Sequence, residues 1–184
     1  MDVIEAIKAR HSYRGEYSAV PVPREDLVTI MEAGLAAPSG CNMQTTSVVA
    51  VDDSETLLKI NDIIGKKVGA TAPAMICVLT QYLSSYHGRC FAVQDYSAAI
   101  ENMLLAIVAL GYQSCWIEGY VTNPDGKGRQ ITRLLGIPDK YELVCCLPVG
   151  AAASCASPPE KKAFHERAWF FEKTPDKDET DGQE

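Results

Sequence analysis

The sequence of 184 residues lacks several features that would place it in a common class at once. Its seven cysteines contain no C-x-x-C spacing, and the odd count fits neither a disulfide framework nor a zinc knuckle. Its longest apolar run, residues 103–110, is far too short to cross a membrane, and no apolar leader segment is present. We therefore expect a protein of the reducing cytoplasm with no membrane partner.

A positive net charge is also missing. The chain carries 17 Lys and Arg against 24 Asp and Glu, which gives a formal net charge of −7. No basic field exists to attract a polyanion, so nucleic acid and anionic membrane surfaces are excluded as general partners. A binding site for an anion must therefore be local, built from a few placed cations.

Common signatures of chemistry are absent as well. The chain has no glycine-rich nucleotide fingerprint, no internal repeat and no evident catalytic triad. His87 and His165 have no carboxylate or thiolate neighbours at the spacing of metal ligands. The sequence therefore predicts no metal site.

What is present is an ordinary globular composition, 47% hydrophobic and 22% charged, in a chain long enough for one buried core. Apolar periodicity, capping residues and β-forming runs predict helices that alternate with strands. The predicted helices cover residues 2–9, 23–37, 54–67 (with Ser54 as the cap), 94–110 and 124–135, and the predicted strands cover residues 47–51, 74–80, 114–117 and 143–149. This alternation predicts a layered α/β or α+β domain.

Three segments carry expectations of their own. Residues 94–110 are apolar almost all round, which is typical of a central helix or of one at a subunit interface. Residues 82–89 form a polar stretch without periodicity, and we expect a loop there. Residues 174–184 are charged and poor in apolar side chains, so we expect a disordered acidic tail.

The most informative segment is residues 9–14, A-R-H-S-Y-R, directly after the first predicted helix. Arg10 and Arg14 can form bidentate, charge-assisted bonds to phosphate oxygens, and Ser12 adds a neutral donor. Taken alone, such a cluster is also typical of a solvated basic turn. Three downstream segments, however, fit the same kind of ligand.

The first two of these are a polar loop and a glycine-containing strand end. In residues 37–44, A-P-S-G-C-N-M-Q, Asn42 and Gln44 offer donors and acceptors suited to the edge of a heterocycle. In residues 111–120, Gly119 would let a flat ligand approach the backbone closely. The alternatives are an ordinary turn for the loop and a set of core aromatics for the strand end.

The third segment is L-P-V-G, residues 147–150, followed later by Lys161 and Lys162. A lysine pair by itself is most often solvated surface. Cys41 adjoins the polar loop, but a reactive thiol needs an accessible, electropositive setting, and the sequence shows neither. We therefore interpret Cys41 as structural.

In this order and at these separations, the segments resemble the FMN-dependent nitroreductase family. The resemblance covers residues 1–171. A-R-H-S-Y-R resembles the family's phosphate- and flavin-binding opening, A-P-S-G-C-N-M-Q its A-P-S-x-x-N-x-Q loop, D-Y-S-A-A-I-E-N-M-L-L-A its central dimer helix, and W-I-E-G-Y the segment beside the reactive edge of the flavin. Each motif is weak alone, and the specificity lies in the set.

This resemblance implies an α+β fold, a three-layer sandwich whose central mixed sheet is flanked by helices. It implies a homodimer in which the C-terminal extension wraps the partner subunit and FMN lies at the subunit interface. The FMN-binding domain would comprise residues 1–173.

The residues that match the family's motifs form the implied cofactor-binding set. The resemblance assigns Arg10 and Ser12 to the phosphate, and Arg14 to the pyrimidine end of the ring, where a cation would stabilise the anionic reduced flavin. Lys161 or Lys162 stands where the family has an arginine that completes the phosphate site. The full set is Arg10, His11, Ser12, Arg14, Pro38, Ser39, Gly40, Asn42, Gln44, Lys67, Ile117, Glu118, Gly119, Gly150 and Lys161.

The implied reaction needs no catalytic side chain, because the flavin carries the chemistry. NAD(P)H would reduce FMN and leave, and a flat acceptor such as a nitroaromatic or a quinone would then be reduced in a ping-pong scheme. Two alternatives stay open. One is a flavoprotein of the same fold that takes electrons from a protein donor. The other is a specialised reductive dehalogenase or flavin-fragmenting enzyme.

Overall fold

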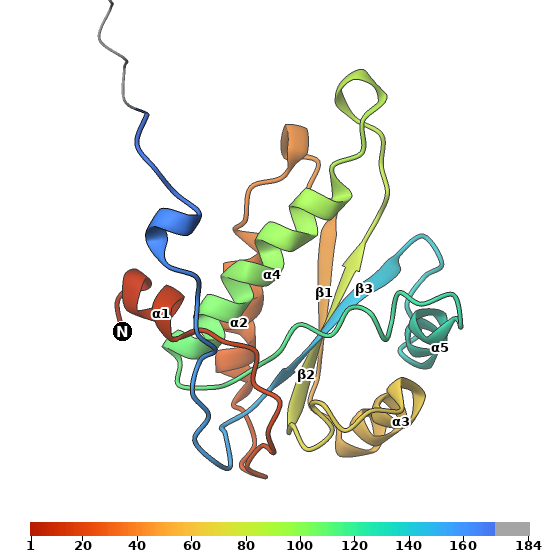
Figure 1. Cartoon of the computed structure of the whole chain (residues 1–184). Coiled ribbons are helices and arrows are strands. Elements are labelled where there is room, and N and C mark those ends of the chain that lie inside the picture. The colour runs from red at the N-terminus through yellow and green to blue at the C-terminus, as the bar shows by residue number, and fades with distance from the viewer. Residues whose placement is uncertain (172–184) are drawn as a thin grey trace, which may run out of the picture.

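A three-stranded antiparallel sheet forms the centre of the molecule in the computed structural model, which describes residues 1–171 (Figure 1). Its strands, in the order β1-β2-β3, are β1 (Thr46–Val51), β2 (Ala74–Thr80) and β3 (Glu142–Val149). Val51 pairs with Met75, and Thr80 pairs with Glu142, so each strand begins beside the end of the previous one. The expected mixed sheet is therefore wrong for the described residues, in which all the paired strands of the sheet run antiparallel.

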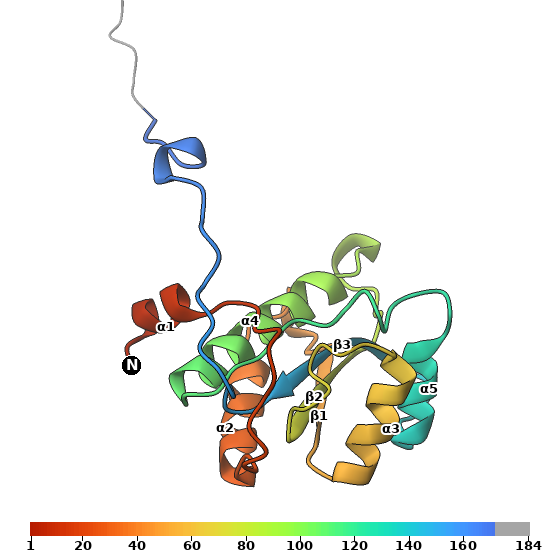
Figure 2. The same cartoon turned by 60° about the horizontal axis from the view of Figure 1, so that its bottom comes forward.

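Helices cover both faces of this sheet and make the three layers (Figures 1 and 2). The helices are α1 (Val3–Ala9), α2 (Arg24–Leu35), α3 (Ser54–Ile64), α4 (Ala92–Ala109) and α5 (Lys127–Leu134). Helices α2 and α4 pack on one face, α3 and α5 lie on the other, and α1 packs against α4. The alternation of elements left α/β and α+β open, and the α+β fold in three layers that the resemblance implies is confirmed.

The sequence of β2 explains why two cores form. Successive side chains of a strand point to opposite faces. Ile76 and Val78 join the core under α2 and α4, whereas Met75 and Cys77 join the core under α3 and α5. Because both faces are covered, the strand is one continuous apolar run rather than an alternating one.

Local chemistry shifts two of the predicted helix starts. The N-cap of α3 is Asp53 rather than Ser54, because the Asp53 carboxylate accepts a 2.8 Å hydrogen bond from the backbone N–H of Thr56. Helix α5 starts at Lys127 rather than at residue 124, because Gly126 has a left-handed backbone with φ 74° that interrupts the turn before it. The end of α3 is similarly fixed by Gly65, with φ 68°, and the predicted extension to residue 67 is wrong.

The predicted strand over residues 114–117 is also wrong. This segment makes only isolated bridges to β3, Gln113 to Gly150 and Ile117 to Cys146. Three short 3-10 turns complete the described elements, η1 (Gly40–Asn42), η2 (Tyr86–Gly88) and η3 (Phe164–Glu166). The predicted disordered tail, residues 174–184, lies outside the described residues.

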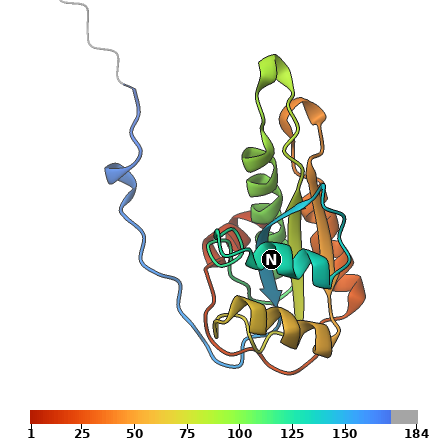
Figure 3. The same cartoon turned by 90° about the vertical axis from the view of Figure 1, so that its right-hand side faces the viewer.

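The chain beyond residue 155 leaves the body of the molecule as an extended arm (Figures 2 and 3). The arm exposes four large aromatic side chains, Phe164, Trp169, Phe170 and Phe171. No helix within residues 1–171 is both long and apolar enough to cross a membrane.

Candidate functional site

The basic strip of residues 10–14 runs directly out of α1. The Arg10 N–H still caps the helix by donating to the Ala6 carbonyl, and the backbone then becomes extended. Tyr13 is buried, its hydroxyl donates to the Glu16 carbonyl at 2.6 Å, and its neighbour Arg14 is exposed. Burial of Tyr13 thus fixes the strip and directs the side chains on either side of it away from the core.

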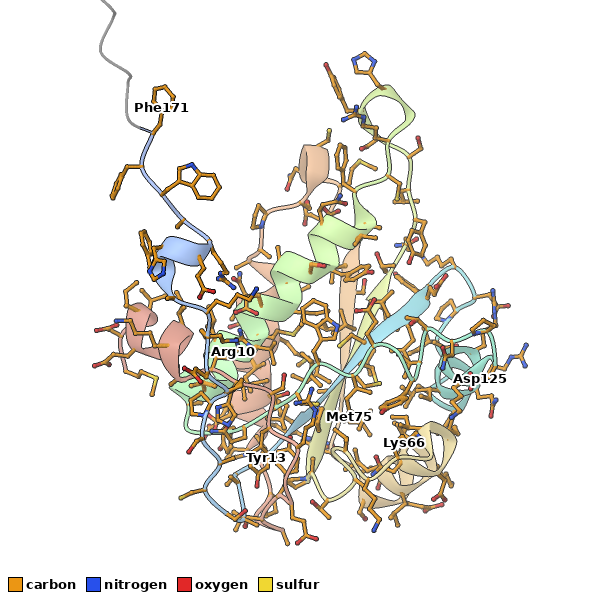
Figure 4. The ribbon with its side chains drawn as sticks, in the orientation of Figure 1. Arg10, Tyr13, Lys66, Met75, Asp125 and Phe171 are labelled. Carbon is orange, nitrogen blue, oxygen red and sulfur yellow. The ribbon has the colours of Figure 1, made fainter. Side chains whose placement is uncertain are left out.

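Arg10 lies against α4, where it meets an acid that the sequence did not reveal (Figure 4). Its Nε lies 3.2 Å from Glu101 Oε1, and this nitrogen is buried without a well-aligned hydrogen-bond acceptor. The Arg10 side chain is 28% exposed. Glu101 therefore holds one side of the guanidinium, and the solvent-exposed part is left for another anion.

His11 has one nitrogen satisfied and one free. Its Nδ1 lies 3.0 Å from the Ala9 carbonyl oxygen and donates a hydrogen bond to it. Nε2 is buried and has no partner among the described residues. It lines a cavity of about 330 Å³ together with Gln113 and residues 152–156. The buried Oε1 of Gln113 is likewise without a partner within residues 1–171.

Residues 113–119 lie between the basic strip and β3. On one side the Tyr13 N–H donates to the Ser114 carbonyl at 2.8 Å. On the other side Ile117 exchanges two backbone hydrogen bonds with Cys146, at 3.1 and 2.9 Å. Residues 113–119 are thereby held at the edge of the sheet, with Ser114 bonded to the strip and Ile117 bonded to β3.

The end of this segment is open to solvent. Trp116 Nε1 donates to Glu118 Oε2 at 2.8 Å, which orients the half-buried carboxylate. Gly119 is exposed, and a Cβ added there would meet nothing within 4 Å. The backbone at Gly119 is therefore open to close approach by a ligand.

The turn that carries Lys67 reaches the same edge. A Cβ on Gly69 would lie 2.8 Å from Pro148 Cγ, so the turn packs tightly on the end of β3. Lys66 Nζ sits 5.5 Å from the centroid of the Tyr120 ring. Figure 4 shows Lys66 beside α3, on the opposite side of the sheet from Arg10. The turn that carries Lys67 therefore lies beside Ile117 and Tyr120 rather than beside Arg10.

Gly150 has a structural reason of its own to be glycine. It is buried, and an added Cβ would lie 2.6 Å from Pro73 Cδ. Its carbonyl accepts the Gln113 N–H at 2.8 Å, so it also anchors residues 113–119. Contact with a ligand is not needed to explain this glycine.

The polar loop of residues 38–44 lies elsewhere, at the N-terminal end of α4. Buried Asp95 holds it, since its two oxygens accept from the Gly40 N–H and from the Thr45 hydroxyl, both at 2.7 Å. Cys41, Asn42 and Gln44 all have positive φ. Within one chain, α4 separates this predicted site loop from the basic strip.

Lys161 and Lys162 lie in the C-terminal arm. Both are exposed, and they line a shallow cavity with Glu160 and Glu166 of the same arm. A single chain therefore does not bring the predicted residue Lys161 to the strip at Arg10.

Burial raises the pKa of several groups near residues 113–119, and the charge of Glu118 adds to the effect for two tyrosines among them. Burial, and then the negative charge of Glu118, raise the pKa of Tyr96. Burial raises the pKa of Tyr82, with further contributions from Glu142, Cys90 and Glu118. Burial also raises the pKa of the Cys115 thiol, which Arg14 partly offsets. Arg14 therefore lies close to Cys115.

Two residues of the site were missed by the sequence analysis, Glu101 and Asp95. Both lie in the D-Y-S-A-A-I-E-N segment that was interpreted as a dimer helix. Their partners, Arg10 and Thr45, are far away in the sequence, so no local pattern could have paired them. Residues 1–171 contain no group of three or more His, Cys, Asp or Glu side chains that could hold a metal ion.

Comparison with known proteins supplies the remaining evidence. A family model described as "Nitroreductase family" matches residues 7–70 and 65–151. A protein of Archaeoglobus fulgidus that carries the provisional name NADH dehydrogenase/NAD(P)H nitroreductase is 31% identical over 167 residues, which cover 90% of both chains. The NADPH-flavin oxidoreductase of Vibrio harveyi is 29% identical over 161 residues, covering 81% of this chain and 65% of the relative.

The chain is also similar in structure to a solved nitroreductase. The crystal structure of a nitroreductase with bound FMN from Bacteroides fragilis superposes with a TM-score of 0.75 and 29% identity. The match covers 94% of this chain and all of the other.

Proposed function

The chain belongs to the nitroreductase family, and from that premise we propose that it is an FMN-dependent oxidoreductase that takes electrons from NAD(P)H. One structural observation carries the proposal. The Tyr13–Ser114 hydrogen bond ties the cationic strip to the start of the segment that ends in the open backbone at Gly119. This link supports our proposal that the strip would bind the phosphate and that the segment would bind the ring of one cofactor.

The residues present fit FMN. Buried His11 Nε2 and Ser114 Oγ have no hydrogen-bond partner among the described residues, and unpaired buried polar atoms are typical of a binding site. Arg10 and Ser12 would hold the phosphate, and Arg14 would lie at the pyrimidine end of the ring. Lys67, Ile117, Glu118 and Gly119 would follow the ring.

The chemistry would then belong to the cofactor. When bound, FMN would accept a hydride from NAD(P)H and reduce a second substrate after the donor has left, in a ping-pong scheme. Arg14 would stabilise the negative charge of the reduced ring, because a fixed cation near a developing anion lowers its free energy. The Trp116–Glu118 hydrogen bond would keep the ring-facing backbone in place. Flat, electron-poor aromatics such as nitroaromatics and quinones are the proposed acceptors.

The proposed site needs a second copy of the chain. The 38–44 loop is kept apart from Arg10 by α4, and Lys161 lies on an arm that leaves the body. In a homodimer, the partner would supply the residues Pro38, Ser39, Gly40, Asn42 and Gln44, and its arm would bring Lys161 or Lys162 to the phosphate. The seven free cysteines favour a reducing compartment, and we assign the cytoplasm as its setting.

An absorbance spectrum of the purified protein tests the proposal. We expect flavin bands that bleach when NADH or NADPH is added without oxygen. Flavin bands that do not bleach with either donor would favour the flavoprotein that takes electrons from a protein partner. A colourless protein that fails to take up added FMN would contradict both.

A further inference from the structure

A cavity of about 520 Å³ lies between α5, the turn of residues 121–126 and the start of β3. Pockets for small ligands typically measure roughly 300–1,000 Å³. Helix α5 contributes Arg129, Thr132 and Arg133 to its wall, and the start of β3 contributes Glu142. Figure 1 shows α5 facing the start of β3, and Figure 4 marks Asp125 at the turn before α5. The proposed FMN site does not use this cavity.

Cations outnumber acids in the wall of this cavity, although the whole chain has a net charge of −7. Arg129 and Arg133 are four residues apart, so their guanidiniums lie on one face of α5. Lys140 is a third cation in the wall, and Asp139 and Glu142 are the two acids. Within residues 1–171, none of the three cations has a carboxylate within 4.0 Å.

Neighbouring Lys127 is a cation with a structural role, and it serves as a comparison for Arg129 and Arg133. Its Nζ donates to the Ile64 carbonyl at 3.0 Å and lies 3.7 Å from Asp125. It therefore ties α5 to α3. Arg129 and Arg133 make no comparable contact within the described chain, and this leaves them available to an anion.

Helix α5 is held rigidly in position. A Cβ on Gly128 would lie 2.5 Å from the Val121 carbonyl oxygen, so the helix packs directly on the backbone at the cavity's edge. The Gly128 N–H donates to the same oxygen at 3.1 Å. Adjacent Arg129 is thus carried by a fixed backbone, which lowers the cost of ordering its side chain around a ligand.

The cavity adjoins the proposed flavin surface. The Val121 N–H donates to the Glu118 carbonyl at 2.8 Å, and the Thr122 N–H donates to the same oxygen at 3.1 Å. One tight turn therefore separates Gly119 from the cavity wall. Tyr82 also lines the cavity, and the negative charge of Glu118 adds to the effect of burial in raising the pKa of Tyr82.

We propose that Arg129, Arg133 and Lys140 bind a phosphate group of the dinucleotide donor while its nicotinamide reaches the flavin surface at Gly119. This rests on the proposed function, because the donor must be a pyridine dinucleotide. Either phosphate source, a monoester dianion or a diester, would bind to the two guanidiniums in the same way. NADH offers only the pyrophosphate, whereas NADPH also offers a 2′-phosphate, so the two donors distinguish the source.

The test is a calorimetric titration of the FMN-loaded protein with NADP⁺ and with NAD⁺, for the native chain and for Arg129→Gln/Arg133→Gln. Arg129 and Arg133 are both exposed, so each contact is worth less than a buried one, and loss of the two together should weaken binding about tenfold to a hundredfold. Weakening of NADP⁺ alone assigns the site to the 2′-phosphate, and equal weakening of both assigns it to the pyrophosphate. The matched control is Arg24→Gln, an exposed arginine on α2 that pairs with Asp52; it should bind both nucleotides as the native chain does.

Equal dissociation constants for the native chain and the double variant would overturn the proposal, as would a native chain that binds neither nucleotide. A variant that loses FMN as well would also overturn it, because the arginines would then support the fold or the flavin. Anaerobic bleaching by NADPH or NADH is recorded in parallel. A native chain that bleaches but shows no effect of the double variant contradicts only this inference, whereas failure to bleach contradicts the proposed function.

Discussion

Single residues decide how the basic strip can hold an anion. Arg10 is set by a helix cap on its backbone and by Glu101 on its side chain, so its guanidinium has little freedom left. Arg14 is exposed and close to Cys115. The two arginines are therefore not equivalent, and we expect them to have separate roles at the phosphate and at the ring.

Replacing Arg10 tests the phosphate end. Arg10→Gln removes a charge-assisted contact of about 1.5–3 kcal/mol, which corresponds to a tenfold to hundredfold weaker dissociation constant for FMN. Fluorescence titration of the apoprotein with FMN measures it. Riboflavin, which has no phosphate, should bind the native and variant proteins with similar affinity. An FMN affinity that does not change would show that Arg10 does not hold the phosphate.

Gly119 allows a test of ring contact that leaves the free protein intact. An added Cβ meets nothing within 4 Å, and φ at this position is not in the left-handed region. Gly119→Ala should therefore keep the unfolding free energy within about 0.5 kcal/mol of the native value. If the ring lies along the backbone here, FMN should bind about tenfold more weakly, close to 1.4 kcal/mol. Urea unfolding of the apoprotein and FMN titration give the two numbers, and native-like FMN affinity would remove Gly119 from the site.

At the scale of elements, helix α4 organises the molecule. It packs on α2 and on one face of the sheet, holds Arg10 through Glu101 and holds the 38–44 loop through Asp95. The helix thus carries contacts to two predicted site segments that a single chain keeps apart. A change in α4 should therefore affect both segments.

Asp95 is the residue through which α4 fixes the loop. Asp95→Ala removes two hydrogen bonds to a buried carboxylate and leaves the Thr45 hydroxyl and the Gly40 N–H unpaired. We expect a loss of unfolding free energy on the order of 3 kcal/mol, measured by urea denaturation. Asp53→Ala, which removes only the cap of α3, should cost about 1 kcal/mol. Equal costs for the two variants would contradict the role of Asp95.

Tyr112 links the end of α4 to α2 and gives a prediction for pH. Its hydroxyl donates to Asp26 Oδ2 at 2.6 Å, and this hydrogen bond, with burial and the charge of Asp26, raises the pKa of Tyr112 to about 12. A tyrosine whose folded pKa is raised contributes stability that is complete below its unfolded value near 10 and is lost as pH rises to about 12. Tyr112→Phe should therefore cost about 1 kcal/mol at pH 7.

The test compares the unfolding free energy of the native chain with that of Tyr112→Phe, because the other titrating groups are the same in both proteins. We expect the gap in unfolding free energy between the native chain and Tyr112→Phe to shrink between about pH 10 and pH 12. Urea denaturation at a series of pH values measures it. A gap that stays constant over this range would exclude the Tyr112–Asp26 bond as its source.

Local pattern predicts the elements well where burial and periodicity agree. The apolar run of β2 matches residues 74–80, because Pro73 precedes it and both faces are covered. Pattern fails at residues 114–117, where Cys115 and Ile117 are buried without continuous strand pairing. Sequence motifs picked out residues 10–14 and 117–119 separately. The link between the two segments depends on the long-range Tyr13–Ser114 bond, for which no local signal exists.

At the scale of the whole molecule, one chain leaves apolar surface uncovered. The outer face of α1 exposes Val3, Ile4 and Ile7, and the arm exposes Trp169 at 82% and Phe171 at 90%. Large exposed apolar side chains in one segment are typical of an interaction surface. Figure 4 shows Phe171 far from the rest of the chain, at the end of the arm. A second copy of the chain is the occupant that the proposed function requires.

Trp169 provides a probe of this assembly. We expect a particle of twice the 20.0 kDa chain mass in sedimentation velocity experiments. In a Trp116→Phe background, the emission of Trp169 should shift to the red on dilution, as the arm loses its contacts. Truncation after residue 159 should yield monomers with weakened FMN binding. A monomer at all concentrations, or a truncated chain that stays dimeric, would contradict exchange of the arms.

The segment that presents Glu118 and Gly119 also closes the outer edge of β3. The bridges at Gln113 and Ile117 occupy backbone groups that would otherwise be free to pair with a strand from another molecule. The residues that protect this edge are therefore the same few that the proposed function assigns to ligand binding. Substitutions that loosen this segment should lower the yield of soluble protein even when FMN is supplied, so evolution of new substrate preference has little freedom here.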